Sequence, residues 1–153
     1  LFSNCKQKPR VMKDTDVYSI EMPEGWKRVD ASVSGVQNTI MMSPAIDGNF
    51  DANINVLARP SSETLSEYFA RGLKIFRTSE QFSINEIGDT IINGLQAKWV
   101  SIDIREDDLE RTGISYFFQK KDIVYGISCV CNKNMKDKYY PIFKATTGTF
   151  KAL

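Results

Sequence analysis

Residues 82–131 alternate between apolar and polar side chains over most of their length, and this alternation constrains the fold more than any other feature of the chain. A period of two residues is typical of β-strands with one face toward a core. Asn93-Gly94, a dipeptide typical of tight hairpin turns, interrupts the alternation. We therefore expect an antiparallel meander, with strands at Phe82–Ile92, Leu95–Ile104, Ile114–Gln119 and Ile123–Cys131.

Two helices are expected to flank this meander. Thr64-Leu65-Ser66-Glu67 has the pattern of a capping box, and apolar residues at helical spacing follow it to about Thr78. Asn134 is suited to cap a final helix. Because Pro141 lacks the N–H that an interior helical position needs, we expect a kink or a new start there.

The segment before the first helix also has the pattern of a sheet. Strands are expected at Val17–Met22, Val36–Met42 and Ala52–Ala58, and Asp47-Gly48-Asn49 is typical of a hairpin turn. A chain of 153 residues is long enough for one domain with a sizeable core. The order of elements predicts an α+β fold, an antiparallel β-sheet covered by helices, as a single domain over residues 17–153.

Cys5 suggests how the protein is attached to a membrane. Leu1-Phe2-Ser3-Asn4-Cys5-Lys6 resembles the end of a lipoprotein signal peptide, although Phe2 and Asn4 differ from the commonest lipobox residues. Residues 1–16 are then a signal-peptide remnant, an acylated cysteine and a flexible tether. The basic residues of the tether would add attraction to anionic lipid; they are Lys6, Lys8, Arg10 and Lys13. The alternative is that Cys5 is an ordinary cysteine in a frayed terminus.

Charge and composition exclude several classes of function. The chain contains no histidine, which removes Ser-His-Asp and Cys-His nucleophiles and imidazole metal sites. The net charge of +1 indicates no nucleic-acid partner. We therefore expect a protein that is not an enzyme and has no cofactor.

Three groups of residues could bind a cation, and each also has a simpler interpretation. Asp47, Asn49 and Asp51 follow the first spacings of an EF-hand loop, but Ala52 and Ala58 replace its Gly and Glu, which favours a turn. Glu106, Asp107, Asp108 and Glu110 form an acidic cluster between two arginines, which favours a solvated hairpin tip. Cys129 and Cys131, with Met41 and Met42, suggest a soft metal such as Cu(I), but buried apolar cysteines are the expected outcome.

A set of aromatic residues could line a ligand groove, although aromatic residues at strand spacing are more often plain core. The set comprises Trp26, Trp99, Tyr116, Phe117, Phe118 and Tyr125.

Three segments carry a family resemblance: Tyr18–Trp26 (YSIEMPEGW), Ile92–Ala97 (INGLQA), and Ile123–Ser128 (IVYGIS) followed by a helix ending at Thr149-Phe150. In this order they resemble the PsbP-like family, which includes photosystem PsbP proteins, Mog nuclear-transport factors and the envelope lipoprotein DcrB. The resemblance covers residues 18–150 and implies a PsbP-like α/β/α sandwich. It also implies accessory binding rather than catalysis, and it transfers no site residues.

These observations predict a non-enzymatic, lipid-anchored protein of the bacterial cell envelope, on its periplasmic or outer-membrane face, that docks another, unidentified envelope protein. The alternative is a carrier for a small apolar or amphipathic ligand held between sheet and helix. A histidine-free hydrolase is a third, minor alternative. A lined cavity of roughly 300 Å³ would favour the carrier, and an exposed apolar patch would favour docking.

Overall fold

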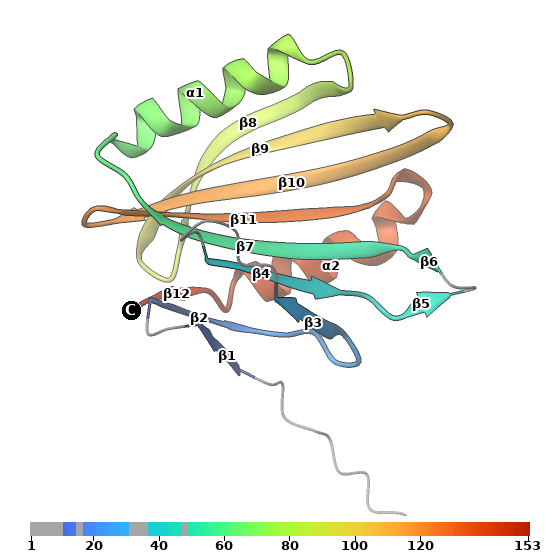
Figure 1. Ribbon diagram of the computed structural model, residues 1–153, viewed down its shortest axis with the longest axis horizontal. Helices are drawn as coiled ribbons and strands as arrows, with labels where there is room; N and C mark the ends of the chain where they lie inside the picture. The colour runs from blue at the N-terminus through green and yellow to red at the C-terminus, as the bar shows by residue number, and fades with distance from the viewer. Residues whose placement is uncertain (1–10, 15–16, 31–36, 47–48) are drawn as a thin grey trace, which may run out of the picture.

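The structure is a computed structural model that describes residues 11–14, 17–30, 37–46 and 49–153 (Figure 1). Its centre is a seven-stranded antiparallel sheet with the order β3-β4-β7-β11-β10-β9-β8. The strands are β3 (Lys27–Asp30), β4 (Gln37–Met42), β7 (Ala52–Pro60), β8 (Phe82–Ile92), β9 (Leu95–Glu106), β10 (Leu109–Lys120) and β11 (Ile123–Asn132). The predicted α+β class is confirmed.

Smaller elements complete the fold. A three-stranded sheet has the order β1-β2-β12, where β1 is Val11–Asp14, β2 is Tyr18–Glu21 and β12 is Lys151–Ala152. The short strands β5 (Ala45–Ile46) and β6 (Asn49–Phe50) pair with each other. A 3₁₀ turn, η1 (Lys133–Met135), precedes α2 (Lys136–Thr147).

Helix α1 (Leu65–Thr78) begins at the predicted capping box. The Thr64 hydroxyl accepts a hydrogen bond from the Glu67 N–H at 3.2 Å, and the Glu67 carboxylate accepts one from the Thr64 N–H at 2.8 Å. The side chains thus satisfy two backbone donors that have no partner inside the helix. The last residue, Thr78, agrees with the prediction from sequence.

The main core lies between the sheet and α2. Alternate residues of β11 supply much of it: Tyr125, Ile127, Cys129 and Cys131 are buried, while Ile123 is partly exposed. Phe143 of α2 and Phe150 pack against this face, and Tyr18 stacks on Phe150 with ring centroids 5.9 Å apart. This core therefore joins α2, both sheets and the C-terminal segment.

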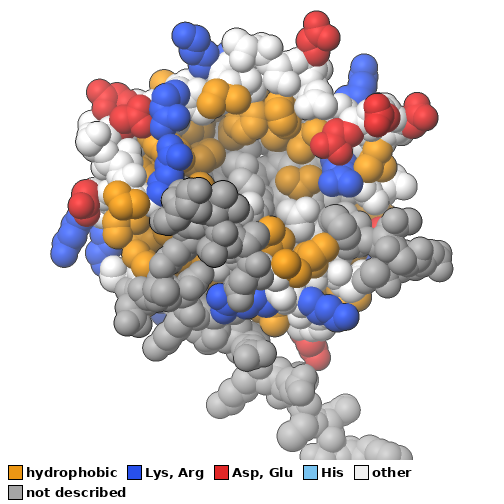
Figure 2. Space-filling model, viewed as in Figure 1, with side chains coloured by type: hydrophobic (Ala, Val, Ile, Leu, Met, Phe, Trp, Pro, Cys, Tyr) orange, Lys and Arg blue, Asp and Glu red, His pale blue; other side chains and the backbone are white. Residues whose placement is uncertain are grey.

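A second, smaller core lies on the opposite face, beneath α1. It consists of Phe69 and Leu73 from α1 with Val100 and Ile102 from β9. Val100 and Ile102 alternate along β9 with Ala97, which belongs to the main core. Figure 2 shows apolar side chains gathered beneath α1 on this face. The two helices thus cover opposite faces of one sheet, which is the predicted α/β/α layering.

Several local predictions differ from the structure. Asn134 does not cap α2, because the chain enters the helix through η1, and Met135 stands at the cap position with no capping side-chain bond. Pro141 lies inside α2, which continues through it without a new start. Strand β10 begins at Leu109 rather than Ile114, so the acidic segment is a tight hairpin turn between two long strands. Val11–Asp14, within the expected tether, pairs with β2.

Candidate functional site

The predicted lipidation site lies outside the described residues. Cys5 and three of the basic tether residues, Lys6, Lys8 and Arg10, belong to the segment 1–10. Lys13 lies on β1, opposite Ser19. The acylation of Cys5 therefore stays a prediction.

The two other cysteines are core residues. Cys129 and Cys131 are buried and not joined in a disulfide. Burial raises the pKa of the Cys129 thiol to about 12 and that of Cys131 to about 11, so both thiols stay protonated near neutral pH. No cluster of three or more potential metal ligands occurs among the described residues, and the interpretation as buried apolar cysteines is favoured.

The acidic segments behave as turns in the described part of the chain. Asp107 and Asp108 form the tip of the β9–β10 hairpin, where Asp107 has a φ of 50° and both side chains are exposed. Asp51 accepts a hydrogen bond from the Tyr139 hydroxyl at 3.3 Å, which ties it to α2. Asp47 lies outside the described residues.

The candidate aromatic residues do not converge on one groove. Trp26 packs against Tyr139 of α2, with ring centroids 6.1 Å apart, and Phe118 lies in the main core beside Phe150. Phe117 points to the opposite face and packs against Phe69 of α1, with ring centroids 5.7 Å apart. Because neighbours in β10 point to opposite faces, the aromatic run of this strand serves both cores.

A cleft of about 660 Å³ lies where the first turn of α1 meets the β8–β9 hairpin. The helix wall is made by Thr64, Leu65 and Ser66, and the sheet wall by Asp89, Thr90, Ile91, Gln96, Ala97 and Lys98. On β8 and β9, Asp89 pairs with Lys98 and Ile91 with Gln96, so these four side chains lie on the α1 face of the sheet. The helix and the hairpin are far apart in sequence, so no local motif predicted this cleft.

Two ion pairs lie in the cleft or beside it. Lys98 Nζ donates to Asp89 Oδ1 at 2.8 Å within the sheet wall and lies 5.8 Å from the centre of the Phe69 ring of α1. Next to the cleft, Arg71 forms two hydrogen bonds with the Glu63 carboxylate, at 3.0 and 2.7 Å. The hydrogen bond from Arg71 is the largest influence on the Glu63 pKa and lowers it. The charges nearest the helix start are therefore already paired.

Strand β8 forms the outer border of the cleft and is the last strand of the sheet. Within the described sheet it pairs only with β9. Two of its isoleucines are exposed, Ile87 at 49% and Ile91 at 68%. The sequence predicted this strand but not its edge position, which depends on the order of the strands. An open strand edge beside a cleft is suited to binding an extended chain.

The α1 face is more polar away from α1. Ser115 and Ser128 share a hydrogen bond of 3.0 Å across β10 and β11, and Asn55 lies opposite Ser128 on β7. Within the described part of the chain, the buried side-chain atoms without a hydrogen-bond partner are Asn38 Oδ1, Asn55 Oδ1 and Arg111 Nε. Buried polar atoms of this kind are uncommon in folded proteins.

Among the described residues, no helix is long and apolar enough to span a bilayer.

Comparison with known proteins identifies the fold. Neither a family model nor a curated protein sequence matches the chain. Among solved structures, cyanobacterial PsbP (CyanoP) from Synechocystis sp. PCC 6803 is similar, with a TM-score of 0.71 and 16% identity over 94% of this chain and 92% of that one. LpqN from Mycobacterium tuberculosis gives a TM-score of 0.70 and 8% identity, covering 94% and 90%.

A third structure, PA94 from Pseudomonas aeruginosa, is described as a protein of unknown function and putative regulator. It gives a TM-score of 0.65 and 15% identity, covering 92% of this chain and 94% of that one. Identities this low establish the fold and no more. The chain therefore has the PsbP-like α+β fold that its sequence predicted.

Proposed function

We propose that the protein is a non-enzymatic accessory protein of the bacterial envelope, held at a membrane surface through acylated Cys5, that docks another envelope protein. The sequence around Cys5 supports the anchor. The structural similarity to LpqN, described as involved in cell envelope biogenesis, supports the location. The cleft contains one carboxylate, that of Asp89, which is already bonded to Lys98, so it gives the hydrolase alternative no support.

The observation that carries the docking function is the exposure of Ile87 and Ile91 on the open edge of β8, beside the cleft. Exposed apolar side chains on an unpaired strand edge promote association unless a partner covers them. Their position next to a cleft of about 660 Å³ gives that partner a defined place to bind.

The cleft also supports the carrier alternative, because its volume lies within the range of about 300–1,000 Å³ usual for ligand sites. However, Phe69, Leu73, Val100 and Ile102 fill the space between α1 and β9, and each is buried. A ligand would therefore bind at the mouth of the sheet–helix interface rather than inside it. This geometry favours docking over enclosure of an apolar ligand.

The anchor is tested by expressing the full-length gene in its host and measuring the intact mass of the mature protein. We expect a chain that begins at Cys5 and carries acyl groups, and we expect Cys5→Ser to move the protein from the membrane to the soluble fraction. Cys131→Ala is the matched control and should stay in the membrane fraction. A mature chain that begins elsewhere without modification would contradict the anchor.

Docking is tested by placing a photo-crosslinking amino acid at Ile91 in cells. We expect discrete crosslinked products from position 91 that weaken when Cys5 is replaced by Ser. Ile75 of α1, 57% exposed and outside the cleft lining, is the matched control position and should give no such products. Equal crosslinked products from both positions would show that the open edge of β8 is not a docking site.

A further inference from the structure

We propose that β8 binds its partner by strand addition: an extended segment with alternating apolar and basic residues pairs with Ile87–Ile92. This inference rests on the proposed docking function and names the chemistry of the partner. It is carried by three independent features of the β8 edge, namely its backbone geometry, its exposed side chains and its charge.

The backbone of β8 is open in one half and closed in the other. A β-bulge between Ile84 and Glu86 leaves Asn85 without a partner on β9. The Asn85 side chain bonds to Asp103 Oδ1 at 3.1 Å, and the Glu86 N–H donates to the Ser101 hydroxyl at 3.2 Å. Bulges of this kind protect a strand edge from pairing. After Glu86 the register with β9 is regular to Ile92, so this second half is suited to accept another strand.

The side chains of this second half fit an apolar partner on one face. Ile87, Asp89 and Ile91 all point to the α1 face, because their β9 partners Val100, Lys98 and Gln96 do. A strand added beside them would place alternate side chains above the same face, toward the first turn of α1. Leu65 and Ile91 border the cleft there and provide apolar contacts for one inserted side chain.

The charge of the edge selects the partner. Strand β8 carries two carboxylates and no lysine or arginine. Asp89 points to the α1 face and is bonded to Lys98, whereas Glu86, at the start of the paired segment, is opposite Ser101 and points to the other face, where the basic residues of the added strand would lie. Glu86 is exposed, and the Asp89 side chain remains 75% exposed although it is bonded to Lys98. Opposite charges across a strand pair are favourable and like charges are not, and a lysine opposite Gly88 would be the diagonal neighbour of Glu86. Lysine or arginine in the added strand is therefore preferred, and an acidic segment is disfavoured.

The probe is a capped peptide of about eight residues in which valine and lysine alternate, a length typical of one strand. Its binding is followed by backbone amide chemical shifts of the protein and by amide hydrogen exchange. We expect saturable binding, with new protection confined to residues 87–92. Protection elsewhere, or no saturable binding, would overturn strand addition.

Two N-methylated versions of the peptide test the backbone pairing directly. Each carries methyl groups on one of the two alternating sets of amide nitrogens. Successive N–H groups of a strand point to opposite sides, so only one set can face β8. We expect one version to lose binding and the other to keep it. Equal affinity of both for the protein would show that side chains alone hold the peptide.

Variants of the protein test the side chains and the charge. We expect Glu86→Lys to weaken binding of the lysine peptide about threefold and to strengthen binding of a matched glutamate peptide. Ile91→Ser, which removes the apolar contact without adding a charge, should weaken binding of both peptides, while the control Ile75→Ser should weaken neither. Identical affinities for lysine and glutamate peptides would contradict the charge preference.

The results separate strand addition from docking in general and from self-association. Crosslinks from Ile91 in cells, together with equal binding of the two methylated peptides, would preserve docking and reject strand addition. A concentration-dependent dimer in sedimentation that Ile91→Lys abolishes would instead identify a second copy of the chain as the occupant and overturn the basic partner.

Discussion

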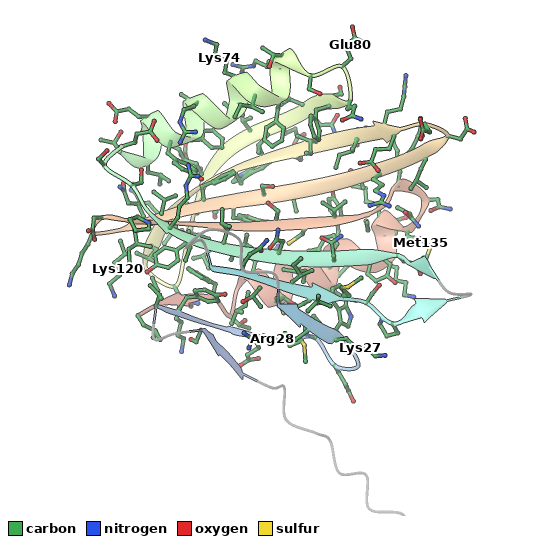
Figure 3. All side chains as sticks on the ribbon, in the orientation of Figure 1. Lys27, Arg28, Lys74, Glu80, Lys120 and Met135 are labelled. Atoms are coloured by element: carbon green, nitrogen blue, oxygen red, sulfur yellow. The ribbon has the colours of Figure 1, made fainter. Side chains whose placement is uncertain are left out.

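The Asn93 side-chain amide donates hydrogen bonds of 2.8 Å to the carbonyl of Phe150 and of 2.8 Å to the carbonyl of Gly148. Asn93 is the first residue of the β8–β9 turn and has a φ of 48°, followed by Gly94 at 79°. One residue thus forms the turn and holds the end of the chain against it. A second contact holds the C-terminal segment at the β10–β11 hairpin. There Lys120 Nζ donates a hydrogen bond of 3.2 Å to the carbonyl of Ala152 (Lys120 is labelled in Figure 3).

Replacing Asn93 by Ala should lower the free energy of unfolding by about 1–3 kcal/mol, because both hydrogen bonds are lost and the positive φ becomes unfavourable. Asn93→Gly keeps the turn conformation and loses the hydrogen bonds, so it should cost less. Urea unfolding of the three proteins measures the two contributions. Equal stability of Asn93→Ala and wild type would show that the contact with the C-terminal segment is not maintained in solution.

Gly88 lies opposite Trp99, and a Cβ at Gly88 would stand 2.7 Å from Cζ2 of the indole. We expect Gly88→Ala to displace the ring and to destabilise the protein by about 1–3 kcal/mol. The indole N–H resonance of Trp99 should shift and that of Trp26 should not. Gly72→Ala is the matched control: its Cβ would meet nothing within 4 Å on α1, so it should stabilise by about 1 kcal/mol.

The raised pKa of Cys129 predicts a loss of stability at alkaline pH. The buried Cys129 thiol of the folded protein has a pKa of about 12, while the thiol of the unfolded chain has its ordinary pKa of 9.0. The stability that the protonated Cys129 thiol gives to the folded state is therefore fully present below pH 9 and is lost as the pH rises from 9 toward 12. Between about pH 8 and 10, wild type should lose about 1.4 kcal/mol more than Cys129→Ala in urea unfolding. Parallel pH profiles would contradict the raised pKa.

Asn55 offers a gain in stability, because its buried Oδ1 has no hydrogen-bond partner among the described residues. Asn55→Val removes this atom and favours the strand, so we expect a gain of about 1 kcal/mol in the free energy of unfolding. Asn53→Val, on the same face of β7, is the control for strand propensity and should give a smaller gain. A loss of stability on Asn55→Val would indicate that the amide is satisfied in solution.

The sequence predicted the elements whose signals are local. The capping box placed the start of α1, and the alternation placed β8, β9 and β11 to within two residues at each end. The first part of β10 was missed because Arg111, Thr112 and Gly113 do not alternate in polarity. Pairing partners distant in the chain were not predictable either, as for β12 with β2.

The candidate site was less predictable than the fold. The cleft brings Thr64–Ser66 against residues 89–98, and neither segment contains a binding motif. The exposed Ile87 and Ile91 indicate a docking surface because β8 is an edge strand, and the strand order was not predictable from the sequence. Cys5, the one site residue taken from the sequence, lies outside the described residues and depends on experiments in the host.

The division of the interior into two cores has a consequence for partial unfolding. Helix α1 is held by the small cluster of Phe69, Leu73, Val100 and Ile102, whereas β7 and β11 are buried in the larger one. We therefore expect the helix to separate from the sheet at a lower free energy than global unfolding requires. Such an opening exposes little surface, so its denaturant m-value will be small. We therefore expect the width of the cleft between α1 and the β8–β9 hairpin to vary with temperature in solution.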